Sequence, residues 1–251
     1  IACPGALVIS IPVAVVAGIG RAARDGILIK GGEFLETSAK INAVALDKTG
    51  TLTQNRPTLT DVVVLERTGT REGLLRIAAQ AEVGSDHPLS GPVLSAANIA
   101  GVAPVSVPDQ VTTIAGQGII AQVGNDHVLV GNASLLRDSA VEPVLLDAAE
   151  SAAEDLAAKG RTPMIIALNG NVLGVLGVVD PVRPAAAGMV NDLRREGVER
   201  VVMLTGDAPL VADAVGAEVG LDRVYASLLP EDKLSVVQKL QEDGFTVAMV
   251  G

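Results

Sequence analysis

The residue best placed to do chemistry is Asp47, an aspartate at the end of an apolar run. Residues 42–46 are a short β-prone run that leads directly into the sequence DKTGT, residues 47–51. In a parallel sheet the carboxyl ends of the strands form the edge where ligands bind. Gly50 permits a tight turn, and Thr49 and Thr51 supply hydroxyls next to a carboxylate that could attack phosphorus. The segment therefore predicts covalent phosphoryl transfer on Asp47.

Two further motifs supply groups that such a nucleophile needs. The apolar run 201–204 ends in Thr205-Gly206-Asp207, which places another hydroxyl and another acid at a comparable strand end. The sequence LPEDK, residues 229–233, opens a predicted helix and supplies Lys233, a cation suited to phosphoryl oxygens. Each piece alone could be an ordinary turn or a solvated side chain. Together, in this order, they favour a haloacid dehalogenase-like phosphoryl-transfer site.

Thr49 distinguishes between two reaction classes. Phosphatases of this fold carry a second aspartate two residues after the nucleophile, where it serves as general acid and base on the acyl phosphate. Thr49 cannot do this, so a phosphoenzyme on Asp47 should persist long enough to be coupled to a conformational change. A pump requires such an intermediate, whereas a phosphatase does not.

The elements that must position these motifs follow two patterns. Short apolar runs, separated late in the chain by predicted helices, have the βαβ order of a parallel sheet. The runs are 41–46, 201–204, 224–226 and 246–250, and the helices are 184–196, 209–219 and 231–242. A different α+β pattern, with glycine-rich turns, lies between about residues 57 and 170: alternating runs at 122–130 and 164–168 and helices near 73–81 and 144–158. The sequence thus predicts an α+β domain inserted into a parallel α/β domain.

The first twenty residues form a separate apolar segment. Residues 1–20 carry no charge, which predicts a membrane-crossing helix whose basic flank stays in the cytoplasm. The basic residues that follow are Arg21, Arg24 and Lys30. A buried core helix is the alternative, because Pro4 and Pro12 weaken a regular helix. Cys3, beside the first proline, is either an apolar filler or a soft-metal ligand.

Composition excludes several classes of protein. The 251 residues are enough for two domains with cores of their own, and the single cysteine excludes an internal disulfide framework. Nineteen Lys and Arg against 29 Asp and Glu give a net charge of -10, which disfavours a nucleic-acid partner. Two phenylalanines, one tyrosine and no tryptophan provide no platform for stacking bases.

With these motifs in place, the chain resembles the P-type ATPases over its whole length, and within them the heavy-metal-transporting subfamily. The resemblance is carried by DKTGTLT from residue 47, Cys3-Pro4 followed by ALVIS, Gly31-Gly32, His87-Pro88, and PEDK at 230–233. It implies that Asp47 is phosphorylated within a catalytic set that also contains Lys48, Thr49, Thr205, Gly206, Asp207 and Lys233. It further implies Mg²⁺ held by the DKTGT loop, with Asp47 and Thr49 as ligands.

The same resemblance makes the inserted region a nucleotide-binding domain with ATP as its ligand. In the subfamily a glutamate lies five residues before the histidine of the His-Pro pair, and Glu82 and His87 keep that spacing. The other matching residues are the GxG glycines Gly116 and Gly118 and the pair Gly131-Asn132. A neutral imidazole can stack on or bond to adenine, and glycines let the backbone approach phosphates.

These nucleotide residues also have ordinary alternatives. Asp86 could cap a helix with Pro88 in its first turn, and a GxG sequence more often marks a turn than a binding site. The second histidine, His127, lies in a Gly-Asn-Asp-His turn and is expected to face solvent.

The resemblance implies an integral membrane protein, placed in the plasma membrane, with residues 21–251 in the cytoplasm. The expected parts are a membrane helix over 1–20, a connector over 21–41, a phosphorylation domain over 42–56 and 171–251, and a nucleotide-binding domain over 57–170. The sequence DPVRP, residues 180–184, resembles the family's return from the second domain to the first, and its prolines stiffen that crossover.

Two departures from the family bear on the function. The metal-site helix of the subfamily usually has a third ligand two residues after the cysteine, where this chain has Gly5, so the transported ion stays open among Cu⁺, Zn²⁺, Cd²⁺ and Co²⁺. Both ends of the sequence predict an internal fragment, inactive alone because the family's second acidic Mg²⁺ loop would follow residue 251. The rival functions are a soluble phosphatase of the same fold and a nucleotide-binding module without turnover.

Overall fold

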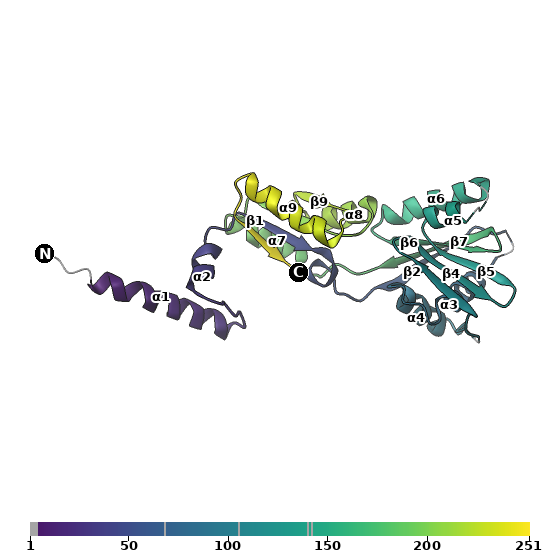
Figure 1. Cartoon of the computed structure of the whole chain (residues 1–251), viewed down its shortest axis with the longest axis horizontal. Helices are drawn as coiled ribbons and strands as arrows, with labels where there is room; N and C mark the ends of the chain where they lie inside the picture. The colour runs from purple at the N-terminus through teal and green to yellow at the C-terminus, as the bar shows by residue number, and fades with distance from the viewer. Residues whose placement is uncertain (1–4, 68, 105, 140, 142) are drawn as a thin grey trace.

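The structure is a computed structural model that describes residues 5–67, 69–104, 106–139, 141 and 143–251. Two bodies of mixed helix and strand lie side by side, and a helical N-terminal arm extends from the first of them (Figure 1). The first body contains the DKTGT segment, and the second is built from the residues between that segment and residue 180.

The first body is built on a four-stranded parallel sheet with the strand order β10-β1-β8-β9. Its strands are β1 (Ala43–Asp47), β8 (Arg200–Leu204), β9 (Arg223–Tyr225) and β10 (Val247–Val250). The helices that connect them are α7 (Ala186–Arg195), α8 (Pro209–Val219) and α9 (Pro230–Glu242). The parallel sheet and its intervening helices confirm the βαβ pattern read from the sequence.

Both faces of this sheet are covered, which explains why its strands are almost continuously apolar. Because successive side chains of a strand point to opposite faces, Val44 and Leu46 pack against α7 and α8, whereas Ala45 packs against α9. The burial of Ala43 to Leu46 holds β1 in place. Asp47, the next residue, therefore has a fixed position at the edge of the sheet.

The second body is a six-stranded antiparallel sheet with the order β2-β7-β6-β5-β4-β3. Its strands are β2 (Thr58–Val64), β3 (Gln110–Ile114), β4 (Gly118–Val123), β5 (Asp126–Gly131), β6 (Thr162–Leu168) and β7 (Asn171–Val179). Helices α3 (Arg71–Glu82) and α4 (Ser90–Ile99) pack on one face, and α5 (Ala133–Asp138) and α6 (Pro143–Ala157) pack on the other (Figure 1).

The predicted boundary at residues 170 and 171 is wrong. Residues 171–179 form β7, which pairs with β2 and β6 in the antiparallel sheet, so the chain returns to the first body only after Val179. The physical reason is that β7 is buried on both faces over most of its length and shows no alternation of polar and apolar residues. No strand was predicted over these residues, and the boundary was placed before them, which put them in the first body.

The chain passes between the bodies twice, after Thr53 and again before Val182, and the two segments are antiparallel. Hydrogen bonds to Asp180 join them. The Thr53 hydroxyl donates to Asp180 Oδ2 at 2.5 Å, and the backbone N–H of Arg56 donates to Asp180 Oδ1 at 2.9 Å. The Arg183 guanidinium then donates to the carbonyl of Gly50 at 2.8 Å. These bonds tie the crossover directly to the DKTGT turn.

The N-terminal arm consists of α1 (Gly5–Arg24) and α2 (Gly32–Ser38). The two helices approach closely at glycines, since a Cβ at Gly18 or Gly32 would come within 2.8 Å of Leu35 or Val15. None of the helices in the described part of the chain has both the length and the apolar character needed to cross a bilayer. Cys3 and Pro4 lie outside the described residues, so the membrane helix and the cysteine ligand stay predictions.

Candidate active site

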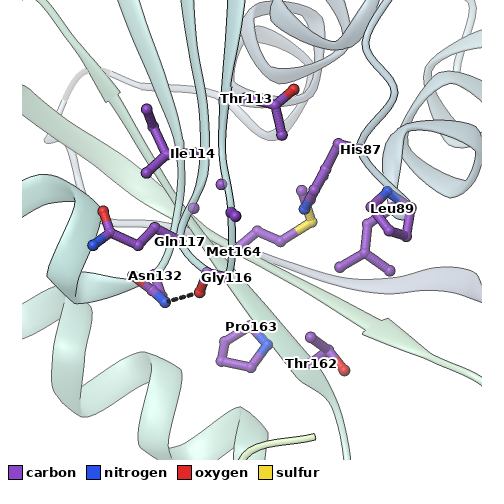
Figure 2. Close-up of a pocket in the computed structure, with 14 residues that line it drawn as sticks. His87, Leu89, Thr113, Ile114, Gly116, Gln117, Asn132, Thr162, Pro163 and Met164 are labelled. Atoms are coloured by element: carbon purple, nitrogen blue, oxygen red, sulfur yellow. Dashed lines mark hydrogen bonds between the residues drawn. The ribbon is translucent and has the colours of Figure 1, made fainter. Parts of the chain in front are cut away.

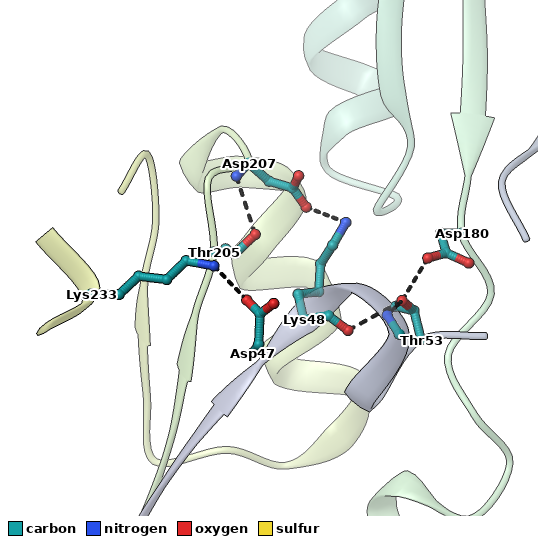
Figure 3. Close-up of polar contacts among 8 residues, drawn as sticks. Asp47, Lys48, Thr53, Asp180, Thr205, Asp207 and Lys233 are labelled. Carbon is teal, nitrogen blue, oxygen red and sulfur yellow. Dashed lines mark hydrogen bonds and ion pairs between the residues drawn. The ribbon is translucent and has the colours of Figure 1, made fainter. Parts of the chain in front are cut away.

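Asp47 is the last residue of β1 and lies at the carboxyl edge of the parallel sheet, opposite Leu204 of β8. Lys233, from the first turn of α9, donates to Asp47 Oδ1 at 2.7 Å (Figure 3). The side chains of Asp47 and Lys233 are 26% and 23% exposed, so an incoming group can reach the carboxylate. The structure therefore brings together the acid and the cation that the sequence predicted, from positions far apart in the chain.

The residues after β8 form the neighbouring wall of the site. The Thr205 side chain is buried, and its hydroxyl accepts a hydrogen bond from the backbone N–H of Asp207 at 3.1 Å. Asp207 in turn forms an ion pair with Lys48 (Figure 3). The pairing joins the two strand-end motifs, since Lys48 belongs to the first and Asp207 to the second.

Hydrogen bonds to Thr53 hold the turn that follows Asp47. Gly50 has a φ of +79°, a conformation that favours glycine, and its backbone N–H donates to Thr53 Oγ1 at 3.2 Å. Thr53 is itself buried and donates to Asp180, as described above. Thr53, Asp180 and Arg183 were not predicted as parts of the site, because the bonds Thr53–Asp180 and Arg183–Gly50 depend on how the crossover packs against this turn.

A pocket of about 390 Å³ opens in the second body, between the α3–α4 connection and the turn before β4 (Figure 2). Five residues that the sequence predicted for the nucleotide line it: His87, Gly116, Gly118, Gly131 and Asn132. Ile114, Pro163 and Met164 add apolar surface to the wall. Pro163 and Met164 were not foreseen, because their place beside the glycine turns depends on the pairing of β5 with β6.

Glu82 is the one predicted nucleotide residue that does not line this pocket. Its side chain is fully buried at the end of α3, and its Oε1 lies 3.0 Å from His87 Nδ1. The capping alternative for Asp86 is not realised, since α4 begins at Ser90 and has Leu89, without a side-chain bond, at its cap position. His127 is exposed, as expected.

The three glycines that line the pocket are needed for different structural reasons, either close packing or backbone conformation. A Cβ at Gly118 would lie 2.2 Å from the Val130 carbonyl oxygen, and one at Gly131 would lie 2.3 Å from the Gln117 carbonyl oxygen. These two glycines are therefore required by the close approach of the chain to itself. Gly116, by contrast, has a φ of +73° and open space around a Cβ, so it is required by its backbone conformation alone.

The Asn132 side chain forms hydrogen bonds that join the turn containing Gly116 to the start of α5. Its Oδ1 accepts from the backbone N–H of Leu135 at 3.1 Å and so caps α5, and its Nδ2 donates to the carbonyl of Gly116 at 2.9 Å. Both ends of the amide are thus engaged within the protein. Asn132 shapes the pocket by holding its glycine turn against the start of α5.

Replacing Gly118 with alanine is expected to destabilise the second body. The added Cβ meets backbone atoms that cannot move aside, and φ at this position is +141°, so we expect a loss of about 1 to 3 kcal/mol in the free energy of unfolding. Urea unfolding of the chain measures it. Gly91→Ala in α4 is the matched control, because a Cβ there meets nothing within 4 Å and should not destabilise. Equal stability of the two variants would contradict the close approach of the chain at Gly118 to the Val130 carbonyl.

A second cavity, of about 400 Å³, lies between the two bodies and is lined by residues of both. The first body contributes Lys48, Thr49 and Asp207, and the second contributes His87 and Thr162. His87 and Thr162 line the pocket of the second body as well. A ligand that occupied the pocket could therefore extend through this cleft to the residues around Asp47.

The described residues include no group of three or more His, Cys, Asp or Glu side chains that could hold a metal ion. Magnesium in phosphoryl-transfer sites is bound by one or two carboxylates together with substrate phosphates and water. Asp47 and Thr49 offer oxygen ligands of the right kind beside the cleft, so the donor set fits Mg²⁺ that arrives with a nucleotide.

Comparison with known proteins identifies the family to which the chain belongs. Residues 41–251 match the family model described as a haloacid dehalogenase-like hydrolase. A probable copper-exporting P-type ATPase V of Mycobacterium tuberculosis is 42% identical over all of this chain and 32% of its own length. A manganese-exporting P-type ATPase of Mycobacterium bovis is 39% identical over all of this chain and 34% of its own length. The chain thus spans about a third of these relatives.

A solved structure gives the same result in three dimensions. The crystal structure of a zinc-transporting PIB-type ATPase in the E2.Pi state matches with a TM-score of 0.74 and 37% identity. The match covers 99% of this chain and 39% of that chain. It includes both bodies of the present structure.

Proposed function

Because the chain belongs to the haloacid dehalogenase-like hydrolase family and its relatives are metal-exporting P-type ATPases, we propose that it is the catalytic core of an ATP-driven metal-cation transporter that is phosphorylated on Asp47. One observation supports the proposal above all others. The Asp47–Lys233 pair lies at the carboxyl edge of the parallel sheet, and a continuous cleft leads from its neighbours Lys48, Thr49 and Asp207 to His87 in the second body.

In the proposed reaction the two bodies share the nucleotide. The base occupies the pocket beside His87, where apolar side chains exclude water, and the phosphates extend through the cleft towards the first body. Asp47 attacks the γ-phosphorus; a bond forms between the carboxylate oxygen and phosphorus, the bond to the β–γ bridging oxygen breaks, and ADP leaves with that electron pair. The product is an aspartyl phosphate.

The residues around Asp47 have distinct tasks in this step. Lys233 holds one oxygen of the nucleophile and offers positive charge to the phosphoryl oxygens. Lys48 and Asp207 keep the two strand ends at a fixed separation through their ion pair. Asp47 and Thr49 would hold Mg²⁺, which neutralises charge on the phosphates when it is bound.

Thr49 separates this proposal from the soluble phosphatase. A phosphatase of this fold needs a second acid at that position to activate water, and the cleft there presents a threonine. The phosphoenzyme should therefore be long-lived enough to isolate. Labelling of the full-length transporter by ATP with a labelled γ-phosphate tests the proposal, because an acyl phosphate survives acid and is cleaved by hydroxylamine. Hydrolysis of small esters without ATP-dependent labelling would identify a phosphatase instead.

The proposal also covers the transported metal ion and the membrane helix. The relatives export copper and manganese, so we propose a transition-metal cation as cargo and leave the ion unassigned, with Cys3 as a candidate ligand. Residues 1–20 would belong to a membrane helix, and residues 21–251 would lie in the cytoplasm. Uncharged sequence over 1–20 and outward-facing apolar side chains on α1 support this placement: Ile9, Ile11, Val13 and Val16.

Replacing His87 with alanine is expected to weaken ATP binding about tenfold or more, because the ring supplies stacking or bonding surface to the base. Phosphorylation by inorganic phosphate should be largely unchanged, since that reaction uses the groups around Asp47. Isothermal titration calorimetry and labelling by inorganic phosphate measure the two effects. His127→Ala, at an exposed position, is the control. Loss of both activities would assign His87 a role in folding.

A further inference from the structure

Thr162 lies where the pocket of the second body meets the cleft between the bodies. It is the first residue of β6, is paired with Val178 of β7, and is partly buried. Four residues line both the pocket and the cleft: Thr162, His87, Pro88 and Leu89. A ligand that extends from the pocket into the cleft must therefore pass along these residues.

The Thr162 hydroxyl is available to such a ligand. Among the described residues this side chain has no hydrogen-bond partner, and Figure 2 shows it at the edge of the pocket. The second body also contributes Pro88, Leu89 and Val178 to the cleft, and these apolar side chains offer no donor. The proposed site uses His87 for the base. A hydroxyl can donate one hydrogen bond, so Thr162 can supply the second body's donor for the part of a nucleotide beyond the base.

The charges across the cleft favour a phosphate path along Thr162. Asp180 and Asp207 contribute carboxylates to the cleft, and like charges repel. Lys48 is the one cation among the described residues that line the cleft, and it is already paired with Asp207. The middle of a triphosphate is therefore favoured along the uncharged wall that the second body provides.

We propose that Thr162 is a phosphate-binding residue whose hydroxyl donates a hydrogen bond to the α- or β-phosphate of the nucleotide. The γ-phosphate must reach Asp47 in the first body, whereas Thr162 lies beside the pocket for the base, so the phosphates between these two ends pass it. This inference rests on the proposed function and adds a residue that holds the nucleotide midway. Because both of these phosphates remain on ADP, the contact persists after phosphoryl transfer.

Replacing Thr162 with valine removes the hydroxyl and keeps a branched side chain that suits a strand. We expect ATP and ADP to bind about tenfold more weakly, because a hydrogen bond to a charged group is lost. Adenosine, which has no phosphate, should bind as it does to the wild type. Thr162→Ser keeps a hydroxyl and should restore the affinities for ATP and ADP. NMR titrations of the chain measure all three affinities, including a weak one for adenosine.

Thr112→Val is the matched control. Thr112 is an exposed threonine on β3 that lines neither the pocket nor the cleft, so the same change there should leave all three affinities unaltered. Urea unfolding of Thr162→Val should show wild-type stability, which separates loss of the hydroxyl from damage to β6.

The pattern of losses decides the proposal. Equal losses for ATP, ADP and adenosine would place the contact at the base or ribose, a loss for ATP alone would place it at the γ-phosphate, and either result would overturn the proposal. Unchanged ATP binding by Thr162→Val would also overturn it, while leaving the proposed function intact if the wild type binds ATP. A wild-type chain that binds none of the three ligands would contradict the proposed function itself, and the phosphate contact with it.

Discussion

Replacing Asp47 with asparagine is expected to abolish the phosphoenzyme and to leave ATP binding intact. The amide has the shape of the carboxylate but is not a nucleophile, so labelling from ATP should fall by more than about 1000-fold. The proposed nucleotide pocket lies in the other body and does not include Asp47, so calorimetry should report an unchanged affinity for ATP or a slightly higher one. The measurement is acid-stable labelling of the full-length transporter.

Asp213→Asn is the matched control for this substitution. Asp213 lies on α8 in the same body, is exposed, and should tolerate the change without effect on labelling. Undiminished labelling of the Asp47→Asn variant would place the phosphoryl group elsewhere and would remove the basis of the proposed function.

Replacing Lys233 with alanine is expected to slow phosphorylation by about 100- to 1000-fold at saturating ATP. The ammonium group is 2.7 Å from Asp47 Oδ1, and no other cation takes that position in the described part of the site, since Lys48 is paired with Asp207. Stability should change little, because an ion pair between partly exposed groups contributes about 0 to 1 kcal/mol. Single-turnover labelling measures the rate, and urea unfolding measures the stability.

Lys239→Ala serves as the control for Lys233→Ala. Lys239 lies on the same helix, α9, and is exposed, so its loss tests whether a changed helix charge alone affects the reaction. A wild-type rate for Lys233→Ala in folded protein would show that the lysine is only a counter-ion of the resting carboxylate.

The arrangement of side chains around Asp47 was largely predictable because the strands that position them follow a simple rule. Strands of a parallel sheet end at one edge, so Asp47 and Thr205 had to come close once residues 43–47 and 200–204 were recognised as strands. The lysine at the start of α9 follows from the same rule, since that helix begins near the same edge. Local apolar patterns were therefore sufficient for the arrangement around Asp47.

The contacts of the crossover between the bodies could not be predicted in this way. The bond between Thr53 and Asp180 depends on how the crossover packs against the turn after β1, which no strand-end rule gives. The burial of Glu82 behind His87 is a further example, because the five-residue spacing indicates proximity but not which side chain faces the pocket. Strand β7 was not recognised in the sequence, because its burial on both faces removes the alternation that identifies an antiparallel strand, and the boundary was therefore placed before it.

The crossover between the two bodies is bonded to both of them. On one side Asp180 accepts from Thr53, and on the other side the chain continues from β7, which pairs with β2 in the second body. Because Arg183 also donates to the Gly50 carbonyl, the crossover is bonded directly to the turn beside Asp47.

The central claim is that ATP transfers its γ-phosphate to Asp47, and the most direct test is to locate the modified residue. The full-length transporter is treated with ATP, quenched in acid and reduced with borohydride, which converts an aspartyl phosphate into homoserine. Mass spectrometry of the peptide that contains residue 47 should then show homoserine at this position only in the ATP-treated sample. Homoserine at another aspartate, or phosphate found only on serine or threonine, would contradict the account.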